Sequence, residues 1–325
     1  MAVTGRPRAV RSFALPVFLF LEMQKAFFIV GPTATGKSEL AADVAARLDG
    51  EVVSADAFQI YRGLPLLTAQ PNESILNKVP HHLIATISLT DEMSAAKFRE
   101  MALSAIAEIN HRGKRAIVVG GSGLYIKALT HGLAPLPAVD PKLRAELDAL
   151  SLDQLYSRLS AVDPLGAENV DRQNKRRLVR ALEIFAQTAR PASAQREQWH
   201  TASPFVDGVF VFRERDDLYE RIDRRVVEMF RAGVVAEVAG VQQVSATAAK
   251  ALGLAAIRRL REKQTTEAEC IALIQQATRH YAKRQLTWFR RQTNFESLNL
   301  SRLKDQAAAV DWILQKAERF FAPAK

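Results

Sequence analysis

One stretch of the sequence combines residue types and spacing that define a chemistry. Residues 31–38 read Gly-Pro-Thr-Ala-Thr-Gly-Lys-Ser, the G-x-x-x-x-G-K-S pattern of a phosphate-binding loop. Glycines let such a loop turn its backbone N–H groups toward a di- or triphosphate, the lysine neutralises charge, and the serine hydroxyl ligates Mg²⁺. The pattern predicts polyphosphate binding and leaves open which polyphosphate is bound.

The flanking segments are those that a phosphate-binding loop requires. The apolar run 26–30 precedes the loop and predicts a strand. A helical pattern follows the loop, with Leu40, Val44, Ala45 and Leu48 on one side. The phosphate would therefore sit at a helix N-terminus, where backbone N–H groups and the helix dipole favour an anion.

Two further strands are expected to deliver side chains to the same place. Residues 51–56 predict a strand that ends in Asp56, residues 94–111 a helix, and residues 115–119 a strand closing on Gly120–Gly123. This β-α-β-α-β order predicts an α/β fold of the phosphate-loop NTPase type, with a parallel sheet and helices on both faces. Ligands gather at the carboxyl ends of such strands, so the loop, Asp56 and Gly120–Gly123 should meet at one site.

The role of Asp56 stays open on the residues alone. A carboxylate at a strand end could hold Mg²⁺ through water, as Walker-B acids do. It could equally be a general base, or a residue that only caps a helix or forms a turn.

The remainder of the chain divides by pattern. Residues 57–93 look irregular, residues 134–141 resemble a linker, and a helical pattern with no convincing strand runs from Lys142 to about Gln198. Residues 209–212 resemble a strand returning to the sheet, before helical patterns at 217–291 and 307–321. We predict an extension at 1–25, the first part of the core at 26–136, an all-helical insertion at 137–203, and a return to the core with a helical C-terminal part at 204–325.

The N-terminal segment and the cysteine count bear on the compartment. Arginines precede the apolar run 13–21, as in a weak secretory signal, but the run is too short to span a bilayer and no small-residue cleavage site follows it. We expect a disordered extension there. The single Cys270 excludes an internal disulfide and a cysteine-based zinc site, and it fits a reducing compartment. The prediction is a cytoplasmic protein without a membrane partner.

Basic residues are concentrated in two segments of this 325-residue chain, whose formal net charge is +10. Residues 171–196 carry seven basic and two acidic side chains, and residues 279–291 carry five basic and no acidic ones. On a helix, Arg279, Lys283 and Arg290 fall within about 40° of one another, with Arg284 and Arg291 on the same side. The aromatic residues Tyr281, Trp288 and Phe289 occupy the other half. The segment predicts a cationic face for nucleic acid or phosphate; the alternative is an ordinary solvated face.

Taken together, these motifs resemble those of the tRNA dimethylallyltransferases (tRNA isopentenyltransferases) in their bacterial form. The resemblance covers about residues 26–295. The segments that carry it, in the family's order, are Gly31–Ser38, Ser54-Ala55-Asp56 with Gln59–Gly63, Thr68-Ala69, His81-His82-Leu83, Gly120–Tyr125, Arg177–Glu183, Arg221-Ile222-Asp223 with Arg225, and Thr278–Arg290.

The resemblance implies a reaction and a role for three residues. Such enzymes move a dimethylallyl group from dimethylallyl diphosphate to the exocyclic N6 amine of the adenosine 3′-adjacent to the tRNA anticodon (position 37), releasing diphosphate with the help of Mg²⁺. By motif position, Asp56 resembles the base, Ser122 a hydroxyl that contacts substrate, and Arg225 an arginine that binds the pyrophosphate. No protein partner is inferred.

It also implies the binding residues. Diphosphate contacts are expected from Gly31, Thr33, Ala34, Thr35, Gly36, Lys37 and Ser38, with Ser38 also on the metal. Contacts to the anticodon stem-loop of the tRNA are expected from Asp56, Ala57, Phe58, Gln59, Ser122, Arg144, Arg176, Arg177, Arg180, Lys250, Lys283, Arg284, Gln285 and Arg290.

The chain departs from the family's usual residues at several positions, and two other functions compete. Ala57 stands for a usual Ser, Gln70 for Lys, Ala85 for Asp, Gln173-Asn174 for Asn-Asp, and Leu254 for Tyr. A small-molecule kinase of the phosphate-loop class would explain the core but not the cationic 279–291 segment. A nucleotide-switched RNA-binding protein is the non-enzymatic alternative.

Overall fold

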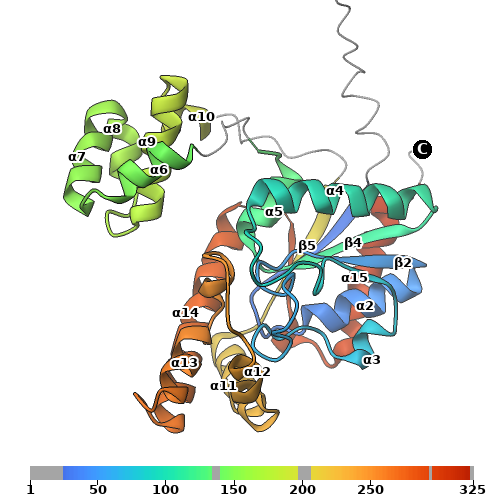
Figure 1. Ribbon diagram of the computed structural model, residues 1–325. Coiled ribbons are helices and arrows are strands. Elements are labelled where there is room, and N and C mark those ends of the chain that lie inside the picture. The colour runs from blue at the N-terminus through green and yellow to red at the C-terminus, as the bar shows by residue number, and fades with distance from the viewer. Residues whose placement is uncertain (1–24, 134–139, 197–205, 293–294, 323–325) are drawn as a thin grey trace, which may run out of the picture. The chain divides into compact units, whose positions relative to one another are not determined.

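The computed structural model describes residues 25–133, 140–196, 206–292 and 295–322 (Figure 1). The chain forms two compact units. One comprises residues up to Ile126 together with Pro204 onward, and the other comprises Lys127–Ser203.

A six-stranded parallel sheet is the centre of the first unit. Its strands are β1 (Ala26–Val30), β2 (Gly50–Ser54), β3 (His81–His82), β4 (Arg115–Gly120), β5 (Val206–Phe212) and β6 (Glu296–Asn299), in the order β3-β2-β4-β1-β5-β6. Val30 lies opposite Gly120 and Phe210, and Ser54 lies opposite Val119. The carboxyl ends of β1, β2 and β4 are therefore level, which confirms the predicted parallel α/β core.

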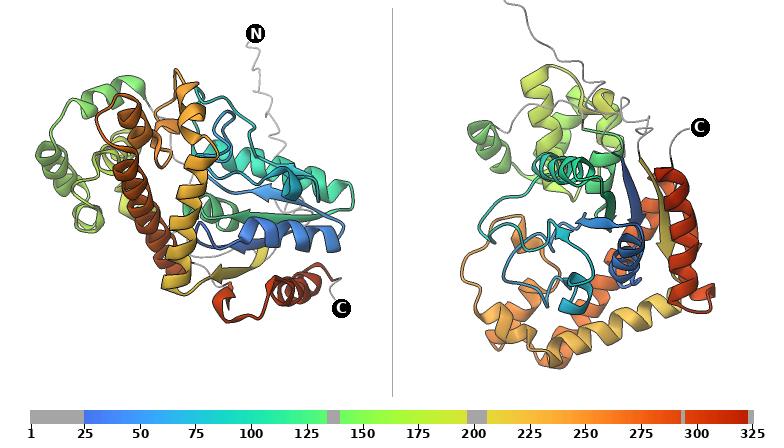
Figure 2. Two further views of the ribbon diagram at one scale, coloured as in Figure 1. Left: turned by 90° about the horizontal axis from the view of Figure 1, so that it is seen from below. Right: turned by 90° about the vertical axis from the view of Figure 1, so that its right-hand side faces the viewer.

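Apolar strand residues pack against helices on both faces of this sheet. On one face, Phe27 and Ile29 form a core with α2 (Lys37–Arg47) and α15 (Gln306–Phe321). Helix α15 contributes Val310, Ile313 and Ala317, a spacing that places them on one side of the helix. The intervening strand residues point to the other face, where α4 (Ala95–His111) packs on β2 and β4 (Figure 2).

The C-terminal helices complete the first unit. They are α11 (Arg215–Arg231), α12 (Val234–Ala239), α13 (Leu254–Arg261) and α14 (Glu267–Gln292). Helix α14 packs along α11 and also against α13. Residues 57–93 contain mostly turns, with the four-residue helix α3 (Glu73–Leu76) and the short strand β3. Helix α5 (Gly123–Thr130) follows β4, and the short 3-10 helix η2 (Ala248–Lys250) precedes α13.

The second unit is helical throughout its described residues. It contains α6 (Pro141–Asp148), α7 (Leu152–Val162), α8 (Pro164–Asn169), α9 (Lys175–Thr188) and α10 (Ala192–Arg196). Leu155 and Leu159 of α7 pack against Leu178 and Leu182 of α9 in a separate apolar core. These helices form on the pattern that the sequence shows from Lys142 onward.

No helix in the described part of the chain is long and apolar enough to cross a membrane. The apolar run at 13–21 and the predicted extension lie outside the described residues.

Candidate active site

The phosphate loop connects β1 to α2 with its helical N–H groups uncapped. The N–H of Gly31 donates to the carbonyl of Gly120 at 3.2 Å, which joins the loop to the end of β4. Only glycine fits at position 31, because an added Cβ would lie 2.1 Å from the carbonyl oxygen of Val211. Gly36 caps α2 with a φ of 93° and offers no side-chain acceptor. The first N–H groups of α2 are thus left for a ligand anion.

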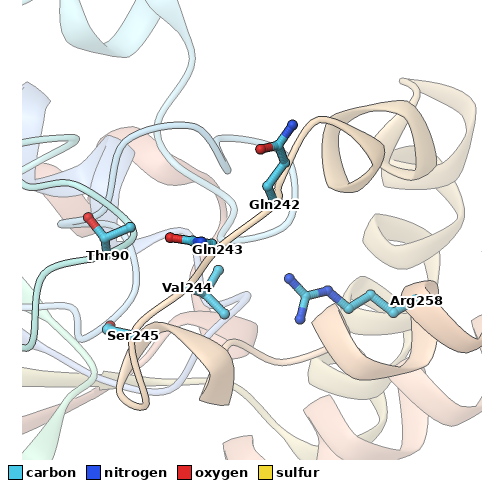
Figure 3. A pocket seen from close by; sticks show the side chains of 6 residues that line it. All are labelled: Thr90, Gln242, Gln243, Val244, Ser245 and Arg258. Atoms are coloured by element: carbon cyan, nitrogen blue, oxygen red, sulfur yellow. The ribbon is translucent and has the colours of Figure 1, made fainter.

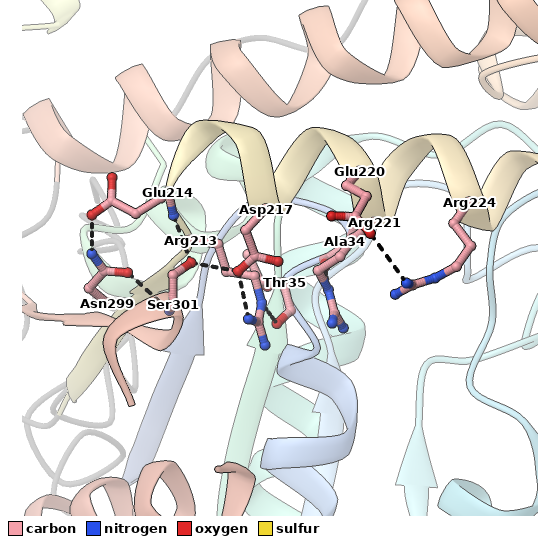
Figure 4. A network of polar contacts seen from close by, with 10 residues as sticks. All are labelled: Ala34, Thr35, Arg213, Glu214, Asp217, Glu220, Arg221, Arg224, Asn299 and Ser301. Atoms are coloured by element: carbon pink, nitrogen blue, oxygen red, sulfur yellow. Dashed lines mark hydrogen bonds and ion pairs between the residues drawn. The ribbon is translucent and has the colours of Figure 1, made fainter. Parts of the chain in front are cut away.

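Arginines from the α11 region hold the outside of this loop (Figure 4). Arg213 Nε donates to the carbonyl of Thr35 at 3.0 Å, and Arg221 Nε to that of Ala34 at 2.9 Å. Arg213 is fixed in turn by an ion pair with Asp217 at 2.9 Å. Because these loop carbonyls are bound by cations, the loop is stabilised with positive charge around it. Sequence reasoning gave Arg213 and Arg221 no role.

Arg225, one turn beyond Arg221, contacts the loop and has an N–H donor that is unpaired among the described residues. Its terminal nitrogen donates to the hydroxyl of Thr33 at 3.0 Å, whereas its buried Nε has no hydrogen-bond partner in the described structure. A buried guanidinium donor without an acceptor is unfavourable, and an oxygen anion bound in the loop would supply the acceptor.

Lys37 lies beside Asp56 and Arg225. Its Nζ donates to the carbonyl of Pro32 at 3.2 Å. Burial lowers the pKa of Lys37 to about 8, the Asp56 charge opposes this shift, and the Arg225 charge adds to it. The structure therefore brings the loop lysine, the carboxylate and the arginine together, as the sequence predicted from strand order for the first two.

Asp56 uses one carboxylate oxygen to form a turn and leaves the other available. Oδ1 accepts the N–H groups of Phe58 at 2.9 Å and Gln59 at 3.3 Å. Oδ2 makes no hydrogen bond that the described residues supply. Beside it, the Ser122 hydroxyl accepts the N–H of Ala57 at 2.9 Å, so β2 and β4 are joined at their carboxyl ends. The turn-forming interpretation of Asp56 and the chemical ones are compatible, since different oxygens serve them.

Helix α14 closes this site through a buried glutamine and two aromatic residues. Gln285 Oε1 accepts the N–H of Thr33 at 2.9 Å, and Nε2 donates to the carbonyl of Gly121 at 2.8 Å. The Trp288 ring packs on Gly123, where an added Cβ would lie 2.5 Å from the ring. Burial raises the pKa of Tyr281, and the nearby Asp56 charge raises it further, so this phenol stays protonated. The assignment of Gln285 to tRNA remains a prediction, but its amide contacts two loop backbones.

The outer side of α14 is cationic with one exception. Lys283, Arg284, Arg290 and Arg291 are exposed. Arg279, however, pairs with both carboxylate oxygens of Asp223 on α11, each at 2.7 Å. The expectation of an unneutralised face is therefore wrong at Arg279, because the acid comes from another helix.

Comparison with known proteins identifies the family of this chain. The family model described as IPP transferase matches residues 59–292. The chain belongs to the IPP transferase family. It is 40% identical to a tRNA dimethylallyltransferase of Akkermansia muciniphila over 289 residues, which is 89% of this chain and 98% of the relative.

Solved structures agree with this family. The crystal structure of a tRNA isopentenylpyrophosphate transferase from Bacillus halodurans has a TM-score of 0.67 at 33% identity, covering 91% of this chain and 98% of that one. A eukaryotic dimethylallyltransferase acting on tRNA has a TM-score of 0.77 at 23% identity, covering 93% of this chain and 81% of that one, and it supports the fold alone.

Some positions at which this IPP transferase departs from usual residues have structural roles here. Gln70 donates to the carbonyls of Gln59 at 3.0 Å and Tyr61 at 2.9 Å, so it holds the 59–61 turn. Gln59 itself donates to the carbonyl of Ala69 at 2.9 Å. Leu254 is 1% exposed in an apolar cluster that Phe58 packs against, so this position contributes to packing.

The cations expected to bind tRNA in the helical unit fall into two groups. Arg144 pairs with the buried Glu183, with Nη2 at 2.6 Å from Oε2, and Arg180 contacts the same oxygen at 3.3 Å. Arg176 and Arg177 are exposed and have no ion pair among the described residues. Lys250, in the first unit, is exposed at the end of η2.

The site suits a metal ion held partly by substrate. The described residues contain no group of three or more His, Cys, Asp or Glu side chains that could hold a metal ion by themselves. Ser38 lies in the first turn of α2, and its hydroxyl makes no hydrogen bond to any described residue. Mg²⁺ commonly binds through one or two protein oxygens together with substrate phosphates and water, so the Ser38 hydroxyl fits one position of that donor set.

Proposed function

We propose that this chain transfers a dimethylallyl group from dimethylallyl diphosphate to the N6 amine of the adenosine 3′-adjacent to the anticodon of tRNA. Membership of the IPP transferase family supports the reaction. The observation that carries it is that Lys37 and Arg225 both hydrogen-bond the phosphate loop, at the Pro32 carbonyl and the Thr33 hydroxyl, with the Asp56 charge close enough to affect the pKa of each. Cations for a departing diphosphate and a carboxylate for an attacking amine are therefore adjacent.

The loop and its two cations would stabilise the leaving group. Negative charge grows on the diphosphate as the allylic C–O bond breaks, and pre-organised donors aimed at that charge lower the barrier. The N–H groups of α2, Lys37 Nζ and the unpartnered Arg225 Nε are such donors. Mg²⁺, when bound at Ser38, would supply further charge neutralisation on the diphosphate.

The carboxylate would take the amine proton. Asp56 Oδ1 is fixed by the turn at Phe58 and Gln59, which holds the carboxylate in one orientation and leaves Oδ2 free for the substrate. A positioned base of this kind contributes about 10²–10⁴-fold to rate. Ser122 would contact the adenine beside it. The base must leave its stack to enter the site, as in other enzymes that modify a nucleobase.

The tRNA would lie on the exposed cations. We assign Lys283, Arg284 and Arg290 of α14 and Arg176 and Arg177 of α9 to the phosphate backbone, because they are exposed and have no carboxylate partner among the described residues. The tRNA substrate makes the cytoplasm the expected compartment.

A single assay tests this function. The protein is mixed with Mg²⁺, unmodified tRNA and labelled dimethylallyl diphosphate, with no ATP. Label appearing in the tRNA, dependent on adenosine at the site next to the anticodon, is the expected result. No label in tRNA, with ATP-dependent transfer to a small metabolite instead, would overturn the proposal in favour of a kinase. Stable tRNA binding without turnover would make the protein a binding module.

A further inference from the structure

Two adjoining hollows lie away from the reaction site. The first, of about 440 Å³, is lined by Thr90, Gln242, Gln243, Val244, Ser245 and Arg258 (Figure 3). The second, of about 450 Å³, is lined by Val241, Gln242, Arg258, Arg261 and Glu262. Gln242 and Arg258 line both, so the hollows adjoin, and the two together are called the depression below. Neither includes a residue of the phosphate loop or Asp56.

Arg258 is the shared charged wall of this depression. Its guanidinium extends from α13 toward the 242–245 segment (Figure 3). The side chain is half-buried, and it forms no ion pair or hydrogen bond with any described residue. A partly desolvated guanidinium gains most from a planar or tetrahedral oxyanion, which its parallel N–H groups can bind in bidentate fashion.

The charges around the depression do not cancel. Arg261 lies one turn after Arg258 and lines the second hollow, so two cations face the same space. Glu262 also lines it and keeps its negative charge, because its carboxylate accepts, among the described residues, only from the neutral amide of Gln264 at 2.8 Å; the two arginines outnumber it. On the first hollow's side, Glu92 is bound to the Ala246 N–H at 2.8 Å.

Asp91 is the other nearby carboxylate, and it lines neither hollow. Its Oδ2 accepts the N–H of Ser88 at 3.1 Å within its own turn. The exposed amides of Gln242 and Gln243 make no hydrogen bond with any described residue, so they add free donors. The lining therefore holds two arginines and neutral amide donors against the one carboxylate of Glu262, an excess of donors that suits a phosphate.

Helix α13 connects this depression to the reaction site through the core. Leu254 and Ile257 are buried in a cluster that Phe58 packs against, and Phe58 is the residue whose N–H is bound by Asp56. The helix also packs on α14, which carries the exposed cations. A polyanion that followed α14 away from the reaction site would meet α13 next.

We propose that Arg258, with Arg261, forms a subsite for a backbone phosphodiester of the tRNA, outside the reaction pocket. This inference rests on the proposed function, because it assumes that tRNA is the polyanion. Its chemistry is that of any phosphate ester, so a free phosphate could also occupy it. The chain offers a matched control in Arg259, which is exposed on the same helix and lines neither hollow.

The first test compares Arg258→Gln with Arg259→Gln. Arg258→Gln should weaken tRNA binding roughly five- to tenfold at low salt and flatten the slope of log affinity against log salt by about 0.7–0.9 for the one lost contact. The KM for dimethylallyl diphosphate should stay unchanged. Equal tRNA affinity and equal salt slope in the two variants would overturn the subsite.

The second test identifies the phosphate. Unmodified tRNA is ethylated at single phosphates, and each species is bound to wild type, Arg258→Gln and Arg259→Gln. One ethylation should weaken binding by wild type and by Arg259→Gln, yet have no further effect on Arg258→Gln. If every ethylation acted alike on all three proteins, Arg258 would contact no tRNA phosphate. If millimolar inorganic phosphate restored the tRNA affinity that Arg258→Gln loses, the site would bind a free anion, and the tRNA assignment would be overturned.

Failure of the subsite and failure of the proposed function give different results. The prenyl-transfer assay on wild type reports the function without reference to Arg258. Label transfer with no Arg258 effect refutes only the subsite, whereas the absence of transfer refutes the function on which the subsite rests.

Discussion

The side chain of Gln285 joins helix α14 to the phosphate loop by accepting the backbone N–H of Thr33 at 2.9 Å. Its other end donates to the carbonyl of Gly121 at 2.8 Å, and the side chain is only 5% exposed. One amide thus fixes three segments, namely α14, the loop after β1 and the loop after β4. The helix that carries the exposed cations is thereby hydrogen-bonded to the phosphate loop.

Replacing Gln285 by Leu should damage diphosphate binding before RNA binding. The change leaves the Thr33 N–H and the Gly121 carbonyl unpaired, at a cost of about 1–3 kcal/mol for each group. We expect a lower melting temperature and a KM for dimethylallyl diphosphate raised about tenfold or more, measured by steady-state transfer assays. Thr287→Ala, an exposed change on the same helix, is the control. A normal KM for the diphosphate, with weaker tRNA binding alone, would instead make Gln285 an RNA contact.

Diphosphate affinity should fall as pH rises above about 8. Lys37 has a pKa lowered to about 8 from 10.5 by burial, so the free protein loses this charge just above neutral pH. The diphosphate binds best to protonated Lys37. Its affinity is therefore highest below pH 8 and falls by up to about tenfold per pH unit above it. Proton uptake on binding at pH 8.5 follows, and calorimetry in buffers of different ionisation enthalpy measures it. Lys37→Met should bind more weakly and take up no proton; uptake that survived in this variant would assign the titration to another group.

The same shift has a consequence for folding. Between pH 8 and 10.5 the unfolded chain holds more protons at Lys37 than the folded one, so the contribution of Lys37 to stability rises with pH across that window. A lysine that destabilises the apo protein below pH 8 is consistent with a group placed for a ligand.

The core was predictable from the sequence because its strands are buried on both faces. Residues 26–30 and 116–119 are continuous apolar runs, and the structure confirms both as parts of parallel strands. Strand β6 was not predicted, since Glu-Ser-Leu-Asn at an edge position buries only Leu298. Its pairing with β5 comes from tertiary structure and leaves no local pattern.

The parts of the site that follow from strand order were predictable from the sequence. The contacts made by helices that cross the loop or one another were not. Strand order alone brings Asp56 to the phosphate loop. The contact of Arg221 with the Ala34 carbonyl depends on α11 crossing the loop 187 positions earlier in the chain. The Arg279–Asp223 pair likewise joins two helices whose relative position no local spacing reveals.

Asp56→Asn should abolish most turnover without unfolding the turn. The asparagine carbonyl can still accept the N–H groups of Phe58 and Gln59, so the 56–59 turn is retained. Loss of the base should lower kcat by roughly 10²–10⁴-fold with tRNA affinity unchanged. Asp56→Ala removes the cap as well and should also lower the melting temperature. Single-turnover transfer assays measure the chemical step, and near-normal turnover of Asp56→Asn would exclude this carboxylate as the base.

The exposed cations of α14 should account for salt-dependent tRNA affinity, whereas Arg279 should not. Replacing Lys283 and Arg290 together by Gln should flatten the salt slope by about one to two units, at about 0.7–0.9 per contact. Arg279→Gln breaks the pair with Asp223 and should lower thermal stability with little change in slope. Filter binding across a salt series and thermal melting distinguish them. If Arg279→Gln changed the salt slope more than the Lys283 and Arg290 double variant did, Asp223 would not neutralise Arg279 in solution.

Within the helical unit, the arginine that pairs with Glu183 should serve stability, and the exposed arginines should serve RNA binding. This carboxylate is fully buried, and although burial raises its pKa, the hydrogen bond and charge of Arg144, with a smaller effect of Arg180, lower it overall. Arg144→Met leaves the buried charge with one partner and should destabilise the unit by up to about 3–5 kcal/mol.

Arg176→Gln with Arg177→Gln is the matched comparison, since both side chains are exposed and have no ion pair among the described residues. This double variant should weaken tRNA binding and leave the melting temperature unchanged. Acid should lower the stability of the helical unit. The ion pairs at Glu183 stabilise the folded state above the unfolded pKa of 4.5, and this contribution is lost as pH falls through the lower pKa of the folded state. Thermal melting from pH 7 to 3, with tRNA affinity at pH 7, measures both effects. If Arg144→Met weakened tRNA binding at an unchanged melting temperature, Arg144 would serve the RNA and not Glu183.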